Sequence, residues 1–332
     1  MLQPIVVKYI FTVLIFCGLM QQLTAQSAAL SSITTGDLYR HLSFIAADSL
    51  QGRGLNTSVH GLEITAGYLK KQAEAMGLKP AFDNYMQQFG LIKSQKASGK
   101  YSFKLYSKNE NPVYTADSVT KLQHNNEHIV EYVQVKNIAG IITGSHPQLK
   151  EECVVFIAHY DHLGMDNNGQ VYNGADDNGS GIVTLLEVAE AFSQLPEKPK
   201  RRIVFLWVSA EEVGLLGSQF YTQHPAFLLE KTVACINPDM VGRVYQPRDS
   251  VWQNSPKLVK DSDGIYTLTN SFSPSLQAIT DSFCTELGLI PDKSLPQCFL
   301  HSSDHYHFHS RGVPILNLST GYHADFHKVS DE

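Results

Sequence analysis

Side chains that bind metal ions recur in this sequence, most of them just after an apolar run that is typical of a β-strand. They occur in five segments: His159-Tyr160-Asp161, Gly174 to Gly181, Glu211-Glu212, Asn237-Pro238-Asp239 and His327. Carboxylates and imidazoles without paired cysteines favour zinc, or a similar first-row divalent ion, in an open site rather than a closed structural one. The pattern therefore predicts a metallohydrolase.

Each of these side chains has a simpler explanation when it is taken alone. A single histidine or aspartate is more often a solvated loop residue than a ligand. Glu211-Glu212 could be an acidic pair favoured by the dipole at a helix N-terminus, and Gly174 to Gly181 could be only a turn. Their joint occurrence, mostly at strand ends, favours one shared site over a set of independent explanations.

The chain of 332 residues has a formal net charge of −6 and no basic run, which argues against nucleic acid as a partner. Residues 1–25 fit a secretory signal peptide, with Lys8 before an apolar run from Tyr9 to Met20 and cleavage after Ala25. That run is too short for a comfortable membrane span, so we expect no stable membrane anchor. The sequence thus predicts an exported protein, periplasmic or secreted. It does not define the oligomeric state.

The remaining length is enough for one large α/β domain with a substantial core. We expect a flexible lead-in over residues 26–34 and a single domain over residues 35–332. Helical patterns cover Thr35 to Ala47 and Leu62 to Met76. Lys93 to Leu122 is polar with weak alternation and is expected to form an antiparallel edge. Val130 to Ile142 alternates as a strand pair would.

Three continuous apolar runs are typical of strands that are covered on both faces: Cys153 to Ala158, Ile203 to Val208 and Val233 to Ile236. Helical patterns at Ile182 to Leu195 and from about Leu215 separate them. This order of elements, strand, helix, strand, helix, strand, predicts an α/β fold with a mostly parallel sheet wrapped by helices. Ligands gather at the carboxyl ends of the strands in such sheets, where most of the metal-binding segments fall.

Several linked motifs resemble, in order, those of the M28 family of two-zinc aminopeptidases. They are His159-Tyr160-Asp161, Gly174 to Gly181, Glu211-Glu212 with Gly214 and Gly217-Ser218, Asn237 to Gly242, and Phe326 to Asp331. The resemblance covers roughly Leu38 to the end, and the motifs together are more specific than any one of them. It implies the phosphorylase/hydrolase-like fold of zinc exopeptidases, a three-layer sandwich with a mostly parallel mixed sheet.

By this resemblance the chain binds two Zn²⁺ ions through five residues. The implied ligands are His159 and Asp239 for one ion, Glu212 and His327 for the other, and Asp177 as a bridge between them. A carboxylate can give one oxygen to each of two ions about 3.5 to 4 Å apart. Asp177 is preferred because the bridging aspartate of the family precedes the closing glycine of the turn, here Gly181, by four positions. Asp176 is then expected to shape the turn backbone.

The resemblance also implies two catalytic residues. Glu211, next to a ligand, would be the general base. Zinc lowers the pKa of bound water from about 15.7 toward about 7, and a carboxylate within reach can take its proton and deliver it to the leaving amine. Asp161, two residues past His159, resembles the carboxylate that orients the ligand imidazole.

Two features depart from the family pattern. Many relatives have a tyrosine before the last ligand, where its hydroxyl stabilises the oxyanion, but this chain has Phe326. The oxyanion would then have to be stabilised by His301, Tyr306, Tyr322 or the metal itself. The chain also ends at Glu332, a few residues after His327, where relatives usually continue into an element that closes over the site. We therefore expect either that this form is truncated or that it lacks this covering element.

Histidines crowd the region 301–309. A spacing of two along His305, His307 and His309 would put all three on one face of a strand and could form a metal clamp. The resemblance instead places this stretch beside the pocket, with Asp304 supporting structure or substrate and the other histidines solvated. Among the cysteines, Cys153 and Cys235 read as buried free thiols, whereas Cys284 and Cys298 could pair in an exported protein; the sequence does not fix that pairing.

Acidic surroundings at Glu211 and Asp239 suit a substrate α-ammonium, so we expect an aminopeptidase acting on peptides with a free N-terminus. Arg243 or Arg311 could instead bind a terminal carboxylate, as in a zinc carboxypeptidase or dipeptidase. A glutaminyl-peptide cyclotransferase shares the fold but uses one zinc, and the Gly174 to Gly181 turn looks more like the peptidases. The last alternative is a non-catalytic binding ectodomain, against which the retained ligands and Glu211 argue. The sequence leaves the preferred N-terminal residue, the peptide length and the native metal open.

Overall fold

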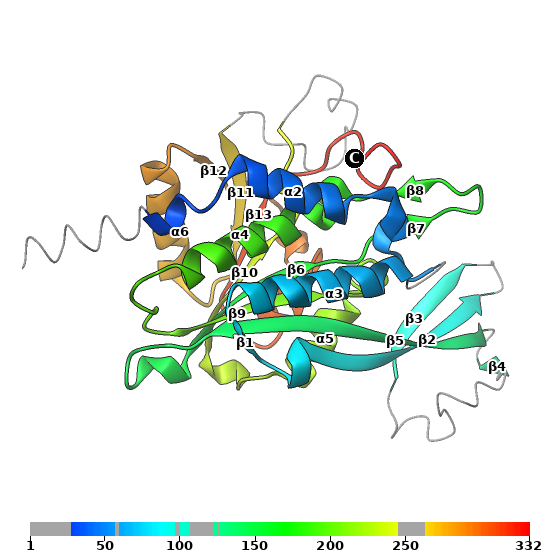
Figure 1. Ribbon diagram of the computed structural model, residues 1–332, viewed down its shortest axis with the longest axis horizontal. Coiled ribbons are helices and arrows are strands. Elements are labelled where there is room, and N and C mark those ends of the chain that lie inside the picture. Colours follow the sequence, from blue (N-terminus) through cyan, green and yellow to red (C-terminus); the bar gives the residue numbers. More distant parts are fainter. Residues whose placement is uncertain (1–27, 57–59, 97–99, 107–122, 125–126, 245–262) are drawn as a thin grey trace, which may run out of the picture.

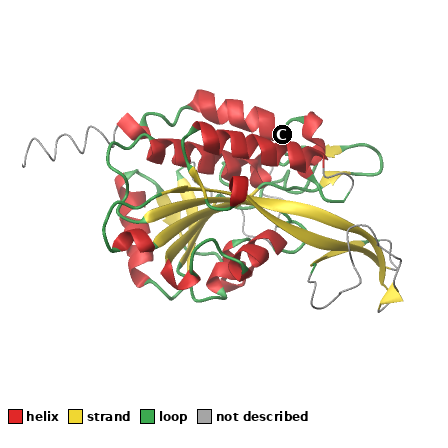
Figure 2. Cartoon of the chain, turned by 60° about the horizontal axis from the view of Figure 1, so that its bottom comes forward, coloured by secondary structure: helices red, strands yellow, loops and turns green. Residues whose placement is uncertain are grey.

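The computed structural model describes residues 28–56, 60–96, 100–106, 123–124, 127–244 and 263–332. Its centre is a mixed eleven-stranded sheet in the order β12-β11-β13-β10-β6-β9-β5-β2-β3, with β1 and β4 paired to β5. Helices cover both faces, so the expected three-layer α/β sandwich is confirmed (Figure 2). The predicted signal peptide, residues 1–25, lies outside the described residues.

The bounds of the elements are as follows. The strands of the large sheet are β1 Lys79–Pro80, β2 Met86–Lys96, β3 Tyr101–Leu105, β4 Gln123–His124, β5 Glu127–Ile142, β6 Cys153–His159, β9 Arg202–Val208, β10 Thr232–Pro238, β11 Gly264–Thr269, β12 Ile290–Asp292 and β13 Ile315–Ser319. A small hairpin consists of β7 Gly164–Met165 and β8 Val171–Tyr172. The α-helices are α2 Thr35–Ile45, α3 His60–Ala75, α4 Gly181–Ser193, α5 Leu216–Gln223, α6 Pro274–Glu286 and α7 His305–His309.

Parallel strands form the centre of the sheet. β6 lies between β9 and β10, and β13 follows on the other side of β10, with all three pairings parallel. Parallel neighbours need long crossover connections, and here helices supply part of them. The carboxyl ends of β9, β6 and β10 therefore open at one edge of the sheet, where the predicted site residues follow.

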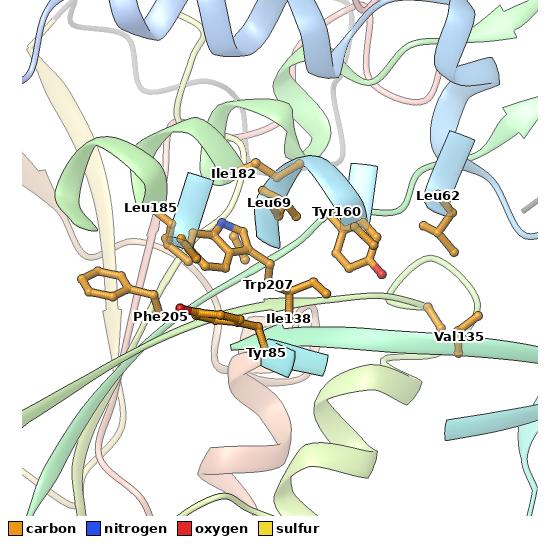
Figure 3. Packing of buried hydrophobic residues seen from close by; sticks show 14 of the residues in the cluster. Leu62, Leu69, Tyr85, Val135, Ile138, Tyr160, Ile182, Leu185, Phe205 and Trp207 are labelled. Atoms are coloured by element: carbon orange, nitrogen blue, oxygen red, sulfur yellow. The ribbon is translucent and has the colours of Figure 1, made fainter. Parts of the chain in front are cut away.

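Strand β9 shows why both faces of the sheet are covered. Successive side chains of a strand point to opposite faces. Trp207 packs on one face in a cluster with Leu69 of α3 and Leu185 of α4, as Figure 3 shows. Leu206 belongs to a second cluster with Phe308 of α7 on the other face. Burial on both faces explains the unbroken apolar runs of the central strands.

The prediction of a strand pair over Val130 to Ile142 is wrong. One strand, β5, spans Glu127–Ile142 and pairs antiparallel with β2 on one side and β9 on the other. The alternation continues without a turn because β5 is one long strand. It extends beyond the sandwich together with β2, which pairs with it, and β3, which pairs with β2 (Figure 1). The antiparallel edge expected over Lys93 to Leu122 is confirmed where β2 pairs with β3. Residues 107–122 of that stretch lie outside the described residues.

Other expectations concern the first helices, the cysteines and membrane spans. α2 and α3 confirm the two predicted helices, and the hydroxyl of Thr34 caps α2 by accepting from the backbone N–H of Asp37 at 3.1 Å. Cys284 and Cys298 are both free, so the pairing considered for them is not formed. Within the described ranges, no helix has the length and apolar character needed to cross a membrane.

Trp207 tests this placement of the core. The side chain is fully buried, so Trp207→Ala should lower the free energy of unfolding by about 3 to 5 kcal/mol, through lost burial and the cavity left behind. Urea denaturation measures the change. Tyr39→Ala is the control, because Tyr39 is 75% exposed and its loss should change the free energy of unfolding by less than about 0.5 kcal/mol. Equal losses in the two variants would contradict the assignment of Trp207 to the core.

Candidate metal centre

The structure brings six predicted side chains to one open cavity of about 330 Å³: His159, Asp177, Glu211, Glu212, Asp239 and His327. β6 ends at His159, Glu211 and Glu212 follow β9, and Asp239 follows β10. The turn before α4 adds a fourth segment, and the loop after β13 adds the fifth. Parallel neighbours bring the first three segments together because their carboxyl ends share one edge.

Asp177 lies between two groups of donors. Its Oδ1 is 3.4 Å from Nε2 of His159, and its Oδ2 is 3.1 Å from Nε2 of His327. Oδ1 of Asp239 lies 3.7 Å from Nε2 of His159, and Oε2 of Glu212 lies 3.5 Å from Nε2 of His327. Each oxygen of Asp177 therefore lies near one histidine, and each of these histidines lies near a further carboxylate.

This spacing fits zinc. Ligand atoms at about 2.0 to 2.2 Å from a tetrahedral ion stand roughly 3.3 to 3.6 Å apart. Two overlapping groups of three donors lie within 4.8 Å of one another: His159 with Asp177 and Glu212, and His159 with Glu211 and Asp239. The first group joins Glu212 to His159, but we assign Glu212 to the His327 side because that contact, at 3.5 Å, matches the spacing of coordinating atoms. The donors present therefore suit zinc, and Asp177 lies between the two histidines.

A tight turn over residues 175–180 presents Asp177. The turn closes at Gly181, where an added Cβ would lie 2.2 Å from Oδ1 of Asn178 and 2.4 Å from the carbonyl oxygen of Pro238. Only glycine allows this close approach. The peptide bond between Asp177 and Asn178 is cis.

The C-terminal segment holds the backbone of the same turn. Asp331 is fully buried, and its carboxylate accepts from the backbone N–H groups of Asp176 and Asp177. Oδ1 of Asp176 accepts from the backbone N–H of Gly242 at 2.7 Å, and Oδ2 lies 3.2 Å from Nε2 of His323. Asp176 thus supports the turn, in line with the role expected for it.

Asp161 lies beside His159, whose imidazole it is expected to orient, and its backbone makes the shorter of two contacts with that ring. Oδ1 of Asp161 lies 3.8 Å from Nδ1 of His159, whereas the backbone carbonyl oxygen of Asp161 lies 3.1 Å from it. The carboxylate accepts from the backbone N–H groups of Glu211 at 3.1 Å and Glu212 at 3.2 Å. A fully buried carboxylate needs such donors, so Asp161 holds the Glu211-Glu212 segment in place.

His162 is a site residue that the sequence analysis missed. Its Nδ1 lies 2.8 Å from Oε1 of Glu212, and the side chain is buried. Burial lowers the pKa of His162 to about 4, so the neutral ring donates to Glu212 and leaves Oε2 to face His327. Its position three residues after His159, in the same strand-end motif, was the available signal.

The region with many histidines forms a helix rather than a strand. α7 spans His305–His309, so a spacing of two does not align these side chains on one face. The expectation that they are solvated is wrong for His305, which is fully buried with Nδ1 at 3.2 Å from Nδ2 of Asn237. Asp304 is also fully buried, and burial raises its pKa to about 7. Across the described residues, none of these side chains belongs to a group of three close metal donors.

Facing carboxylates change the proton affinities within the cavity. Burial raises the pKa of Glu211 well above its ordinary value, and the charges of Glu212 and Asp304 add to the rise. Burial lowers the pKa of His159, but the facing carboxylates of Glu211 and Asp177 outweigh it and hold that pKa well above 6.5. Without ions, these contacts favour the protonated form of His159.

Zn²⁺ binding should release protons, and the apparent affinity should rise with pH. Coordination needs a neutral imidazole, and the raised pKa means that the metal-free protein holds a proton on His159 that the ion must displace. That competition weakens as the pH rises toward the raised pKa. Calorimetric titrations in two buffers of different protonation enthalpy count the protons released. His301→Ala, outside the cavity, should behave like wild type, and an affinity that does not change with pH would contradict the protonated state of His159.

Comparison with known proteins places this site in a family context. The model of peptidase family M28 matches residues 137–332. Among curated relatives, aminopeptidase YwaD of Bacillus subtilis (strain 168) is 29% identical over 188 residues, which are 56% of this chain and 36% of that protein. The match thus spans about a third of the relative's length.

Solved structures share the architecture over most of the chain. A zinc aminopeptidase from Bacillus subtilis, BSAP, superposes with a TM-score of 0.58 at 15% identity, over 90% of this chain and 88% of that one. Porphyromonas gingivalis glutaminyl cyclase gives a TM-score of 0.58 at 17% identity, over 91% of each chain. At these identities the likeness shows the fold alone. The family match extends over more than half of the chain and includes every metal-binding segment described above, and this protein belongs to peptidase family M28.

Proposed function

We propose that this protein is an exported aminopeptidase that binds two Zn²⁺ ions and hydrolyses N-terminal residues from peptides. The observation that carries the proposal is the position of Asp177, whose two carboxylate oxygens each face a histidine. That arrangement suits two ions about 3.5 to 4 Å apart. Membership of a peptidase family supports peptides as substrates. Export rests on the signal-like pattern of residues 1–25.

Glu211 is the general base of the proposed reaction. When bound, the Zn²⁺ ions supply Lewis acidity to the substrate carbonyl and to a water molecule. Oε2 of Glu211 lies 3.9 Å from Nε2 of His159, and Asp161 fixes the backbone of Glu211. Its raised pKa suits a group that accepts a proton from water at neutral pH. The water oxygen bonds to the carbonyl carbon, the C–N bond breaks, and Glu211 delivers the proton to the leaving amine.

The charge of the cavity favours a substrate amino terminus over a carboxylate. Among the described residues that line it, none is lysine or arginine. Arg243, considered above as a carboxylate-binding residue, lies 3.3 Å from Asp331 and 3.4 Å from Asp325 instead. Arg311, the other candidate, is exposed and is not among the lining residues. An α-ammonium would find the carboxylates of Glu211 and Asp239 here, which supports an aminopeptidase over a carboxypeptidase.

A second, smaller cavity adjoins the metal centre. The two cavities share four lining residues: Asp239, Met240, Ser302 and Tyr322. Away from the metal centre, the smaller cavity is lined by apolar and small polar side chains, among them Tyr266, Leu295, Phe299, Ser303 and Asn317. We assign this cavity to the side chain of the N-terminal residue. Its mixed lining favours small to medium apolar side chains over charged ones.

Tyr322 supplies the hydroxyl that Phe326 lacks. The ring of Phe326 stacks on His327 with centroids 3.8 Å apart, and Tyr322 packs on Phe326 at 4.4 Å and lines both cavities. Burial raises the pKa of Tyr322 to about 12, so its hydroxyl remains a donor. His301 and Tyr306 lie against each other at 4.7 Å, and neither is among the described residues lining either cavity. We therefore assign stabilisation of the developing oxyanion to the hydroxyl of Tyr322.

Peptide hydrolysis tests the proposed function directly. The wild type should contain near two Zn²⁺ per chain and release amino acids from unblocked peptides but not from N-acetylated ones. Glu211→Gln should retain the metal and lose turnover by about 100-fold or more, because only the proton acceptor is removed. Asp177→Asn should lose metal as well as turnover. Metal analysis and mass spectrometry of the products measure both effects.

Each alternative function has its own outcome in that assay. One metal ion with ammonia release from N-terminal glutamine would favour a cyclotransferase, whose fold the glutaminyl cyclase comparison shows to be shared. Release of residues from the C-terminus would favour a carboxypeptidase, and cleavage confined to dipeptides would favour a dipeptidase. A wild type with neither metal nor turnover would overturn the proposal in favour of a binding ectodomain.

Tyr322→Phe tests the assigned oxyanion donor. The change removes one hydroxyl and keeps the ring, so kcat should fall by about 100- to 1,000-fold while metal content and KM change little. Tyr306→Phe is the matched control and should leave kcat unchanged. A Tyr322→Phe enzyme with the kcat of the wild type would leave stabilisation of the oxyanion to the metal alone.

A further inference from the structure

Arg53 is a fully buried arginine that contacts segments next to the metal ligands and that the proposed reaction does not use. It lies in the connection between α2 and α3, outside residues 137–332 that match the family. A buried guanidinium is rare unless it is paired or fully hydrogen-bonded, so its partners indicate what it does.

The guanidinium of Arg53 donates to four backbone carbonyls. Nε donates to Tyr160 at 2.9 Å, in the loop after β6 that follows His159. Nη2 donates to Gly174 at 3.0 Å, where the turn that presents Asp177 begins. Nη1 donates to Asn173 at 2.6 Å and to Ile45 at 2.5 Å. One side chain thus connects the segments that carry the two central ligands to the end of α2.

The backbone around Arg53 has an unusual conformation that accompanies the hydrogen bonds of its guanidinium. Gln51, Gly52 and Arg53 all have left-handed φ angles, of 51°, 65° and 51°, which residues other than glycine rarely adopt. An added Cβ on Gly54 would lie 2.4 Å from Cα of Gly164, so the two backbones touch directly. The carbonyl of Arg53 also accepts from the backbone N–H of His162 at 3.3 Å. Such a conformation persists only where its surroundings enforce it.

Arg53 also brings positive charge to an acidic region. Burial lowers its pKa to about 10, against the opposing effect of nearby carboxylates, so the guanidinium stays charged at neutral pH. The carboxylates that act on it are Asp161, Asp177, Asp331 and Glu212. Two of these are proposed metal ligands. The charge of Arg53 therefore offsets part of the repulsion between ligand carboxylates.

We propose that Arg53 is a positioning residue of the metal centre. It holds the loop after β6 and the turn before α4 at a fixed separation through their carbonyls, and its charge stabilises the clustered carboxylates before any ion binds. The inference rests on the proposed function only in requiring that the centre binds metal. A residue that merely supported the fold would affect stability and leave the Zn²⁺ affinity of the folded protein unchanged.

Zn²⁺ affinity of the full-length chain separates these two roles. Arg53→Met and Arg53→Lys are stripped of metal with a chelator, checked for folding by circular dichroism, and titrated against a chromophoric zinc chelator. Both variants should bind Zn²⁺ about 10- to 100-fold more weakly, as expected when a group that supports metal ligands is lost. Lysine keeps the charge, but one ammonium group cannot bind four carbonyls at once, so Arg53→Lys should also weaken binding.

Leu69→Ala provides the matched control. Leu69 is fully buried in the helical layer that packs on the same face of the sheet, and its truncation lowers stability without touching the ligand loops. This variant should unfold at a lower temperature and bind Zn²⁺ as the wild type does. If Arg53→Met does not fold, Arg53→Lys decides the question by the same measurement.

The outcomes separate the inference from the proposed function. A wild type that binds Zn²⁺ while a folded Arg53 variant binds it equally well would overturn the positioning role and leave the aminopeptidase proposal intact. A wild type that binds no divalent metal would overturn the proposed function and this inference together. Weaker binding in both Arg53 variants but not in Leu69→Ala supports the positioning role.

Discussion

Repulsion among buried carboxylates is the constraint on which the rest of this structure depends. Five acidic side chains meet at the carboxyl ends of the central strands: Asp161, Asp177, Glu211, Glu212 and Asp239. Buried carboxylates are costly unless they are paired or hydrogen-bonded. Burial would raise the pKa of Asp177, but contacts with His159 and His327 bring that pKa well below its ordinary value. Cationic side chains and backbone N–H groups around the cavity make this concentration of charge tolerable.

The turn that presents Asp177 is stabilised from two sides by groups of opposite charge. Its backbone N–H groups are satisfied by the carboxylate of Asp331, near the end of the chain. The carbonyls at its start are satisfied by the guanidinium of Arg53, near the beginning. A sheet with a parallel centre supplies the converging strand ends, and these two side chains then fix the segment that the sheet itself does not hold.

Parts of this arrangement could be predicted from the sequence because they depend on local patterns. The sheet was indicated by the apolar runs of β6, β9 and β10. The edge where the site lies was indicated by the acidic and imidazole residues at the ends of these runs. The contact of Asp161 with the Glu211-Glu212 segment could not be predicted, because it depends on which backbone N–H groups of a distant loop face its carboxylate. Arg53 gave no signal in a glycine-rich loop, since its acceptors at Tyr160 and Gly174 are separated from it by 107 and 121 residues. The helix α7 could not be told from a strand by its pattern, because five residues are too few to reveal a period.

The contact between Asp331 and the turn at Asp176 has a consequence for the timing of folding. The two residues are separated by 155 positions, and Arg53 contributes from near the opposite end of the chain. Contacts of such long range form late, because the loop they close must be ordered first. A nascent chain can form the sandwich around β6 and β9 while Asp331 is still unsynthesised. The centre would therefore be assembled only after Asp331 has been synthesised, and a chain that lacks Asp331 would keep a folded sheet with an open, unsupported turn.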